Sequence, residues 1–119
     1  MKKLFLFFVA ISLAQISFSQ TVPLDSVAKY EGKKITVCSK VIGTHVSSGD
    51  KKNTYINFGK PYPDNTFTVM ISGDDAAKFK YVPADFLQDK TVCITGTVTI
   101  FKGKPEIVVT SEDQIKIQK

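Results

Sequence analysis

Few side chains in this sequence have the types and spacing that catalysis requires. The single histidine, His45, has no cysteine or acidic residue at metal-ligand spacing. Asp74 and Asp75 could form a metal-binding pair, but a helix N-terminus explains two acids before Ala76 and Ala77 better, because acids there complement the helix dipole. Catalysis needs titratable groups that converge on one site. The sequence therefore predicts no catalytic residue, no metal site, no cofactor and no enzymatic activity.

The two cysteines are candidates for a disulfide. Cys38 and Cys93 lie in two segments that both alternate apolar and polar residues, Ile35 to Val41 and Val92 to Val98. If these segments pair as antiparallel strands in the register that matches Cys38 with Cys93, their apolar residues share one face. A bridge is then geometrically allowed, and two small free thiols are the alternative.

The N-terminus indicates the compartment. Lys2 and Lys3 precede an apolar run from Leu4 to Leu13, and small residues follow at Ser17 and Ser19, which is the plan of a secretory signal peptide. A membrane anchor is the alternative, but the run is short of the ~20 apolar residues that a spanning helix needs. We therefore expect a signal peptide over residues 1–19, one domain over 20–119, and a secreted or periplasmic protein.

The chain is basic, but it contains no arginine. Without Lys2 and Lys3, 14 lysines remain against 11 acidic residues, a net charge near +3. Lysine lacks the planar fork that binds phosphate and guanine in a bidentate way. A sequence-specific DNA-binding protein is therefore not expected, and the lysines either follow a phosphate backbone or simply keep the protein soluble.

The order of the predicted elements indicates a small closed barrel. The two long strand segments place Ser39 and Gly96 on their apolar faces, where a small residue permits a bend or a close approach. A sizeable helical connection is predicted only between the third and fourth strands. That order is typical of the all-β, five-stranded OB-fold barrel. The predicted elements are a short helix at Pro23–Tyr30, strands at 35–46, Thr54–Phe58, Phe67–Ser72, Thr91–Phe101 and Pro105–Thr110, helical turns within Gly73–Lys90, and a capped turn at Ser111–Ile115.

The chain also resembles a known group of proteins, the small secreted bacterial OB-fold proteins described as nucleic-acid-binding-like. The resemblance covers nearly all of residues 20–119. Members of that group often carry glycine where this chain has Ser39, and tryptophan where it has Ser72. The motifs that carry the resemblance are Gly32-Lys33 with Val37-Cys38, Tyr55-Ile56-Asn57-Phe58-Gly59-Lys60, Phe67 to Ile71 with Gly73-Asp74-Asp75, Lys90 to Cys93 with Thr95-Gly96, and Lys102-Gly103-Lys104-Pro105-Glu106-Ile107.

The OB fold implies a ligand face on the outside of the second and third strands, flanked by loops. Strand alternation predicts which side chains point outward there, and the neighbouring loops add lysines and a tyrosine. Aromatic groups that stack on bases, surrounded by cations, are the parts of a single-strand binder. The alternative is that the tyrosines cover the core and the lysines are solvated. The predicted ligand-binding residues are Tyr55, Asn57, Thr68, Met70, Lys51, Lys52, Lys60, Tyr62, Lys102 and Lys104.

Together these patterns predict a monomeric OB-fold binding module. Weak contact with single-stranded nucleic acid, tolerant of sequence, is the leading expectation for its function. An envelope protein-interaction module with no nucleic-acid role is the alternative, and a glycan, peptide or small ligand also stays open.

Overall fold

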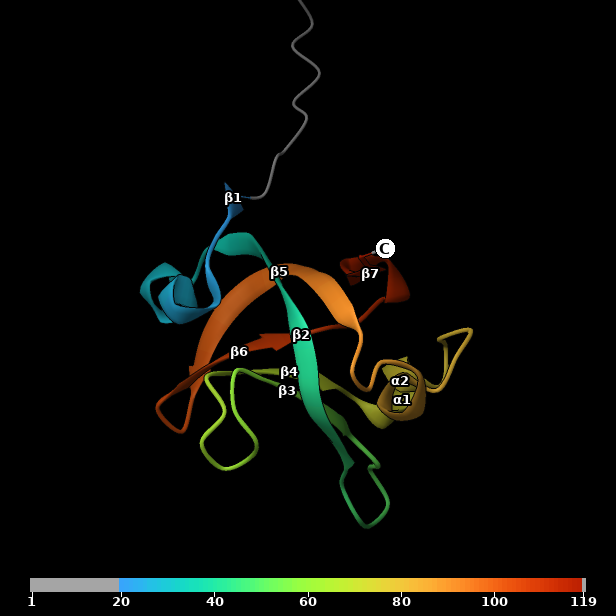
Figure 1. Ribbon diagram of the computed structural model, residues 1–119. Coiled ribbons are helices and arrows are strands. Elements are labelled where there is room, and N and C mark those ends of the chain that lie inside the picture. The colour runs from blue at the N-terminus through green and yellow to red at the C-terminus, as the bar shows by residue number, and fades with distance from the viewer. Residues whose placement is uncertain (1–19, 119) are drawn as a thin grey trace, which may run out of the picture.

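The computed structural model describes residues 20–118, which form a strongly curved sheet with short helices at its ends (Figure 1). The predicted signal peptide, residues 1–19, lies outside the described residues. The elements are β1 (Gln20–Thr21), η1 (Leu24–Tyr30, a 3-10 helix), β2 (Lys34–Val46), β3 (Thr54–Phe58), β4 (Phe67–Ile71), α1 (Gly73–Ala76), α2 (Pro83–Phe86), β5 (Thr91–Phe101), β6 (Lys104–Val108), η2 (Glu112–Gln114) and β7 (Ile115–Ile117).

Five of these strands close into a barrel. β2 runs antiparallel to β3, β3 antiparallel to β4, β4 parallel to β6, and β6 antiparallel to β5. β5 then pairs antiparallel with the first half of β2, which completes the ring. The predicted OB-fold barrel, with a short helix before its first strand and helices between the third and fourth, is confirmed.

Strand alternation builds the core. In β4, Phe67, Val69 and Ile71 are buried while Thr68 and Met70 point outward. The same period of two holds in β5, where Val92, Ile94 and Val98 are buried. One face of each strand therefore fills the barrel, and the other face is left for solvent or ligand.

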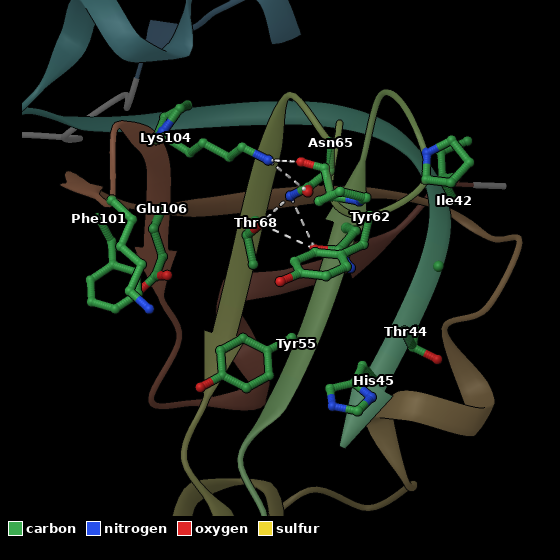
Figure 2. Close-up of a pocket in the computed structure, with 16 residues that line it drawn as sticks. Ile42, Thr44, His45, Tyr55, Tyr62, Asn65, Thr68, Phe101, Lys104 and Glu106 are labelled. Atoms are coloured by element: carbon green, nitrogen blue, oxygen red, sulfur yellow. Dashed lines mark hydrogen bonds between the residues drawn. The ribbon is translucent and has the colours of Figure 1, made fainter. Parts of the chain in front are cut away.

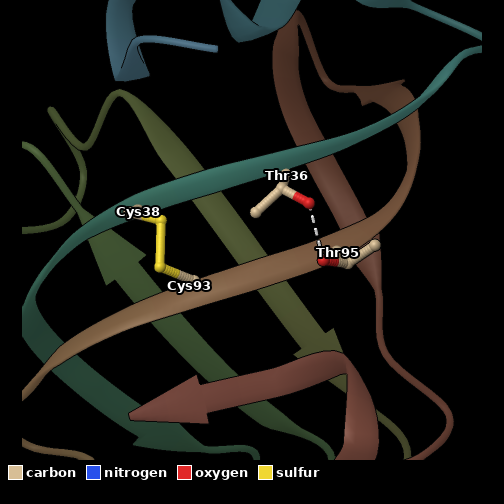
Figure 3. Close-up of a disulfide and its surroundings, with 4 residues drawn as sticks. All are labelled: Thr36, Cys38, Cys93 and Thr95. Atoms are coloured by element: carbon tan, nitrogen blue, oxygen red, sulfur yellow. Dashed lines mark hydrogen bonds between the residues drawn. A yellow bond between two sulfur atoms is a disulfide. The ribbon is translucent and has the colours of Figure 1, made fainter. Parts of the chain in front are cut away.

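The predicted pairing of the two cysteine-bearing strands is confirmed. Cys38 lies opposite Cys93 in the β2–β5 ladder, and the structure joins them in a disulfide with Cα atoms 4.0 Å apart. Two residues along, the Thr36 and Thr95 hydroxyls are 2.8 Å apart on the same face of the ladder (Figure 3). Side chains from both strands therefore join β2 to β5 where the barrel closes.

The small residue predicted on the apolar face of β5 permits a close approach. A Cβ atom on Gly96 would lie 2.5 Å from Cγ2 of Ile107, a buried residue of β6. The sharp irregularity of β2 lies just beyond Ser39, at a bulge between Val41 and Gly43. This bulge lets one long strand belong to both sides of the barrel.

The structure differs from the sequence prediction at several boundaries. β4 ends at Ile71, one residue early, because Ser72 caps α1: its hydroxyl accepts a hydrogen bond from the Asp75 backbone at 3.2 Å. The strand predicted at Pro105–Thr110 is β6, which begins and ends earlier. Two short strands were not predicted: β1 adds to β2, and β7 adds to β5.

Candidate functional site

The outward side chains of β2, β3, β4 and β6 form parallel rows across the curved sheet. In one row, His45 lies opposite Tyr55, Tyr55 opposite Met70, and Met70 beside Val108. The next row is more polar, and its members in strand order are Gly43, Asn57, Thr68, Glu106 and Thr99. The barrel therefore sets an aromatic and apolar row directly beside a polar one.

A groove of about 670 Å³ lies over the polar row (Figure 2). Its sides come from the end of β2, the loop between β3 and β4, and the turn between β5 and β6. Aromatic and cationic side chains from all of these elements line it: His45, Tyr55, Tyr62, Phe101, Lys102 and Lys104. Much of this lining is apolar, with charges at one end.

The aromatic groups of the groove are accessible. Tyr55 is half-buried, and its ring stacks with that of His45 at a centroid distance of 6.4 Å and an interplanar angle of 25°. Tyr62 is 77% exposed and Phe101 55% exposed. A planar ligand can therefore reach aromatic faces from two sides of the groove, which is the arrangement that base stacking uses.

The loop between β3 and β4 is held against the groove floor by a hydrogen-bonded network. The Asn65 amide donates to the Asn57 side-chain oxygen at 3.1 Å and to the Thr68 hydroxyl at 2.5 Å, and Thr68 donates to Asn57 at 3.1 Å. The Lys104 ammonium donates to the Pro63 carbonyl and, at 3.2 Å, to the Asn65 side-chain oxygen. These groups satisfy one another, so they position the loop that carries Tyr62.

Glu106 gives the groove a carboxylate. It lies on β6 between Thr68 of β4 and Thr99 of β5, and its side chain is drawn close to Phe101 (Figure 2). The residue is half-buried, and this burial raises the pKa of the Glu106 carboxyl above its ordinary value. The groove therefore contains an acid as well as the expected lysines.

The structure brings six of the ten predicted ligand-binding residues to this groove and leaves four outside its lining. Asn57 is among the six, but it is buried beneath the β3–β4 loop and its side chain is engaged there. The residues along the groove are Tyr55, Asn57, Thr68, Tyr62, Lys102 and Lys104. The other four are Met70, Lys51, Lys52 and Lys60.

Lys51 and Lys52 lie elsewhere because their loop folds toward α1. The Gly73 backbone donates to the Asn53 side chain at 3.3 Å, and Ser47 donates to the Asn53 carbonyl at 2.9 Å. Lys51 and Lys52 are exposed beyond this contact. Met70 is outward on β4, but it belongs to the apolar row and not to the groove lining.

Several residues of the groove lining escaped the sequence prediction, among them His45, Asn65, Phe101 and Glu106. His45 lies exposed on the rim of the groove. Phe101 and Glu106 have outward parity, but they lie on the fourth and fifth predicted strands, whereas the OB fold implied a ligand face on the second and third. Asn65 is a loop residue with no such pattern.

No group of three or more histidine, cysteine or acidic side chains within residues 20–118 is arranged to hold a metal ion. No helix in this part of the chain is long and apolar enough to cross a membrane.

Comparisons with known proteins identify the fold. No protein-family model matches the chain, and a search of curated proteins finds no match either. Among solved structures, a chain of yeast Stn1 and Ten1 is 16% identical over 87% of this chain, with a TM-score of 0.60. A chain described as an aspartyl-tRNA synthetase from Leishmania major Friedlin is 15% identical over 90%, with a TM-score of 0.53. This chain spans 65% and 22% of those two chains, and the similarity is one of fold: the protein has an OB-fold barrel.

Proposed function

We propose that this protein is a monomeric, non-catalytic binding module that holds single-stranded nucleic acid in the groove, without reading a defined sequence. The observation that carries the proposal is the lining of the groove, where accessible aromatic rings of Tyr55, Tyr62 and Phe101 lie beside Lys102 and Lys104. Rings stack on bases of any kind, and cations follow the phosphates. With few lysines at the groove, we expect a dissociation constant of about 10⁻⁶–10⁻⁴ M at physiological salt.

The chemistry of the groove favours a single strand of nucleic acid over an isolated small anion as its ligand. The cations lie at one end, at the β5–β6 turn, while Tyr55 and His45 lie toward the end of β2. A ligand that uses both regions must present a planar group and a negative charge at separate points. A nucleotide chain offers both with every residue.

The test is a titration of labelled single-stranded DNA and RNA at low and physiological salt, with light scattering to check the monomeric mass. We expect Tyr55→Ala to weaken binding by about 1–3 kcal/mol, the range for one stacked base. Phe86→Ala is the matched control, because Phe86 is a partly exposed aromatic on α2 outside the groove lining. Absence of binding by folded wild-type protein at low salt would remove the proposal, and equal binding by Tyr55→Ala would move the site elsewhere.

A protein-interaction module is the second candidate, and an exposed apolar patch supports it. Val82 is 60% exposed and Phe86 39% exposed, and Tyr81 packs on Phe86 with ring centroids 4.5 Å apart. Apolar surface of this kind is a common feature of contact sites. An affinity for a protein partner that changes little with salt would favour this candidate. Phe86→Ala should then reduce that affinity, and Tyr55→Ala should not.

We also propose that the protein acts in an oxidising compartment, outside the cytoplasm. The Cys38–Cys93 disulfide supports this location, because structural disulfides form and persist in such compartments. We expect N-terminal sequencing of the exported protein to begin within a few residues of Gln20. Recovery of an intact Met1 in the exported fraction would contradict the proposed processing.

A further inference from the structure

The groove carries a carboxylate that accepts no hydrogen bond from any group of the described chain. Glu106 sits on β6 with Thr68 beside it on β4 and Thr99 beside it on β5. Thr99 donates its hydroxyl hydrogen bond to the backbone carbonyl of Glu106, at 3.1 Å, which leaves the carboxylate free. The carboxylate thus borders the groove next to Phe101 (Figure 2).

Neither nearby lysine forms an ion pair with Glu106 within residues 20–118. The Lys104 ammonium is bound to Pro63 and Asn65 of the β3–β4 loop, and the Lys102 ammonium lies 5.4 Å from the centroid of the Phe101 ring. Within residues 20–118 the one ion pair is Lys78–Asp75, on and just beyond α1. A ligand that fills the groove would remove water from the Glu106 carboxylate, and a desolvated carboxylate that gains no hydrogen bond in return is costly.

A ligand in the groove could become a hydrogen-bond partner of the Glu106 carboxylate only by offering it a donor. An ionised carboxylate accepts hydrogen bonds and offers none. The exocyclic amino group of cytosine is a good donor to a glutamate, and guanine presents neighbouring N–H groups on one edge. Uracil and thymine instead carry a carbonyl oxygen at the position of the cytosine amino group. Their one ring N–H lies between two carbonyl oxygens, which would repel a carboxylate that approached it.

We propose that Glu106 is a specificity-determining residue, which makes the groove prefer bases that carry an exocyclic amino donor (cytosine, adenine and guanine) over uracil and thymine, which carry none. The inference rests on the proposed function, because it assigns a base preference to the same groove. Stacking on Tyr55 and phosphate contacts with Lys102 supply binding to any base, while Glu106 distinguishes the base edges. The preference is for a type of base and not for a sequence.

The experiment compares short homopolymers of deoxycytidine and deoxyuridine of equal length, labelled alike, at neutral pH and low salt. The two bases share ring size and differ at the amino or carbonyl group and the adjacent ring nitrogen. A hydrogen bond to a charged group is worth about 1.5–3 kcal/mol. We expect deoxycytidine to bind about tenfold or more tightly than deoxyuridine. For Glu106→Gln, whose amide both donates and accepts, we expect the ratio of affinities to fall toward one.

Glu31→Gln is the matched control, because it removes the same charge at an exposed position outside the groove lining. It should change both affinities equally and leave the ratio intact. Equal binding of the two homopolymers by the wild type would overturn the Glu106 inference while the proposed function stands. Binding of neither homopolymer by folded protein would overturn both. A ratio that survives Glu106→Gln would assign the preference to another residue and so overturn the inference.

Discussion

Lys102 and Lys52 carry the same charge on the same kind of backbone, yet they lie at different places relative to the groove. Both have left-handed conformations, with φ of 50° and 45°. Lys102 lies in the β5–β6 turn and lines the groove, whereas Lys52 lies in the loop that folds toward α1. Substituting each lysine in turn therefore distinguishes a phosphate contact made at the groove from a general effect of the protein's charge.

We expect Lys102→Asn to flatten the dependence of oligonucleotide affinity on salt by about 0.7 in the log–log slope, the value for one phosphate contact on a single strand. Asparagine suits this test because it tolerates the left-handed backbone. Lys52→Asn makes the same change at a matched backbone and should leave the slope near that of the wild type. Titration at a series of salt concentrations measures both slopes, and similar slopes for the two variants would show that Lys102 makes no particular contact.

The sequence predicted residues of the groove from strand parity and from the loops that flank the implied ligand face. Tyr55 and Thr68 were assigned correctly to the outer face, because each alternates with buried neighbours. Asn57 obeyed the same parity, but the β3–β4 loop covers it, and loop conformation does not follow from alternation. The distant placement of Lys51 and Lys52 likewise depends on Asn53, whose contact with Gly73 spans two separate elements.

At the scale of elements, β2 and β5 are joined across their ladder by the disulfide, which closes a loop with a sequence separation of 55. We expect Cys38→Val with Cys93→Val to lower the free energy of unfolding by about 2–4 kcal/mol, because the unfolded chain is no longer constrained. Valine retains a good strand former on both strands. Urea unfolding measures the difference, and a reductant should lower the stability of the wild type but not of the double variant. An unchanged wild-type midpoint after complete reduction would contradict the expected contribution.

Element length decided which strands the sequence could predict. β2 and β5 have 13 and 11 residues, so their alternation is long enough to recognise. β1 and β7 have only two and three residues, and no periodicity can be read from such segments. Their strand conformation comes from pairing with β2 and β5, which is a tertiary effect.

For the molecule as a whole, the order of elements was enough to predict the barrel, but not the groove. The OB fold follows from five strands with helices between the third and fourth. The groove depends on a parallel pairing of β4 with β6, which sets Thr68 beside Glu106. That register joins segments far apart in the chain, and a strand pattern alone does not contain it. Glu106 was therefore missed, although its own alternation with Ile107 was visible.

The location of the tyrosines gives the protein an optical property of practical use. The chain has four tyrosines and no tryptophan. Tyr55 and Tyr62 line the groove, whereas Tyr30 and Tyr81 pack against the core. Because no indole is present to receive energy from the phenol rings, ultraviolet emission reports on the tyrosines directly. We therefore expect occupation of the groove to alter the intrinsic fluorescence of the unmodified protein, with no dye attached.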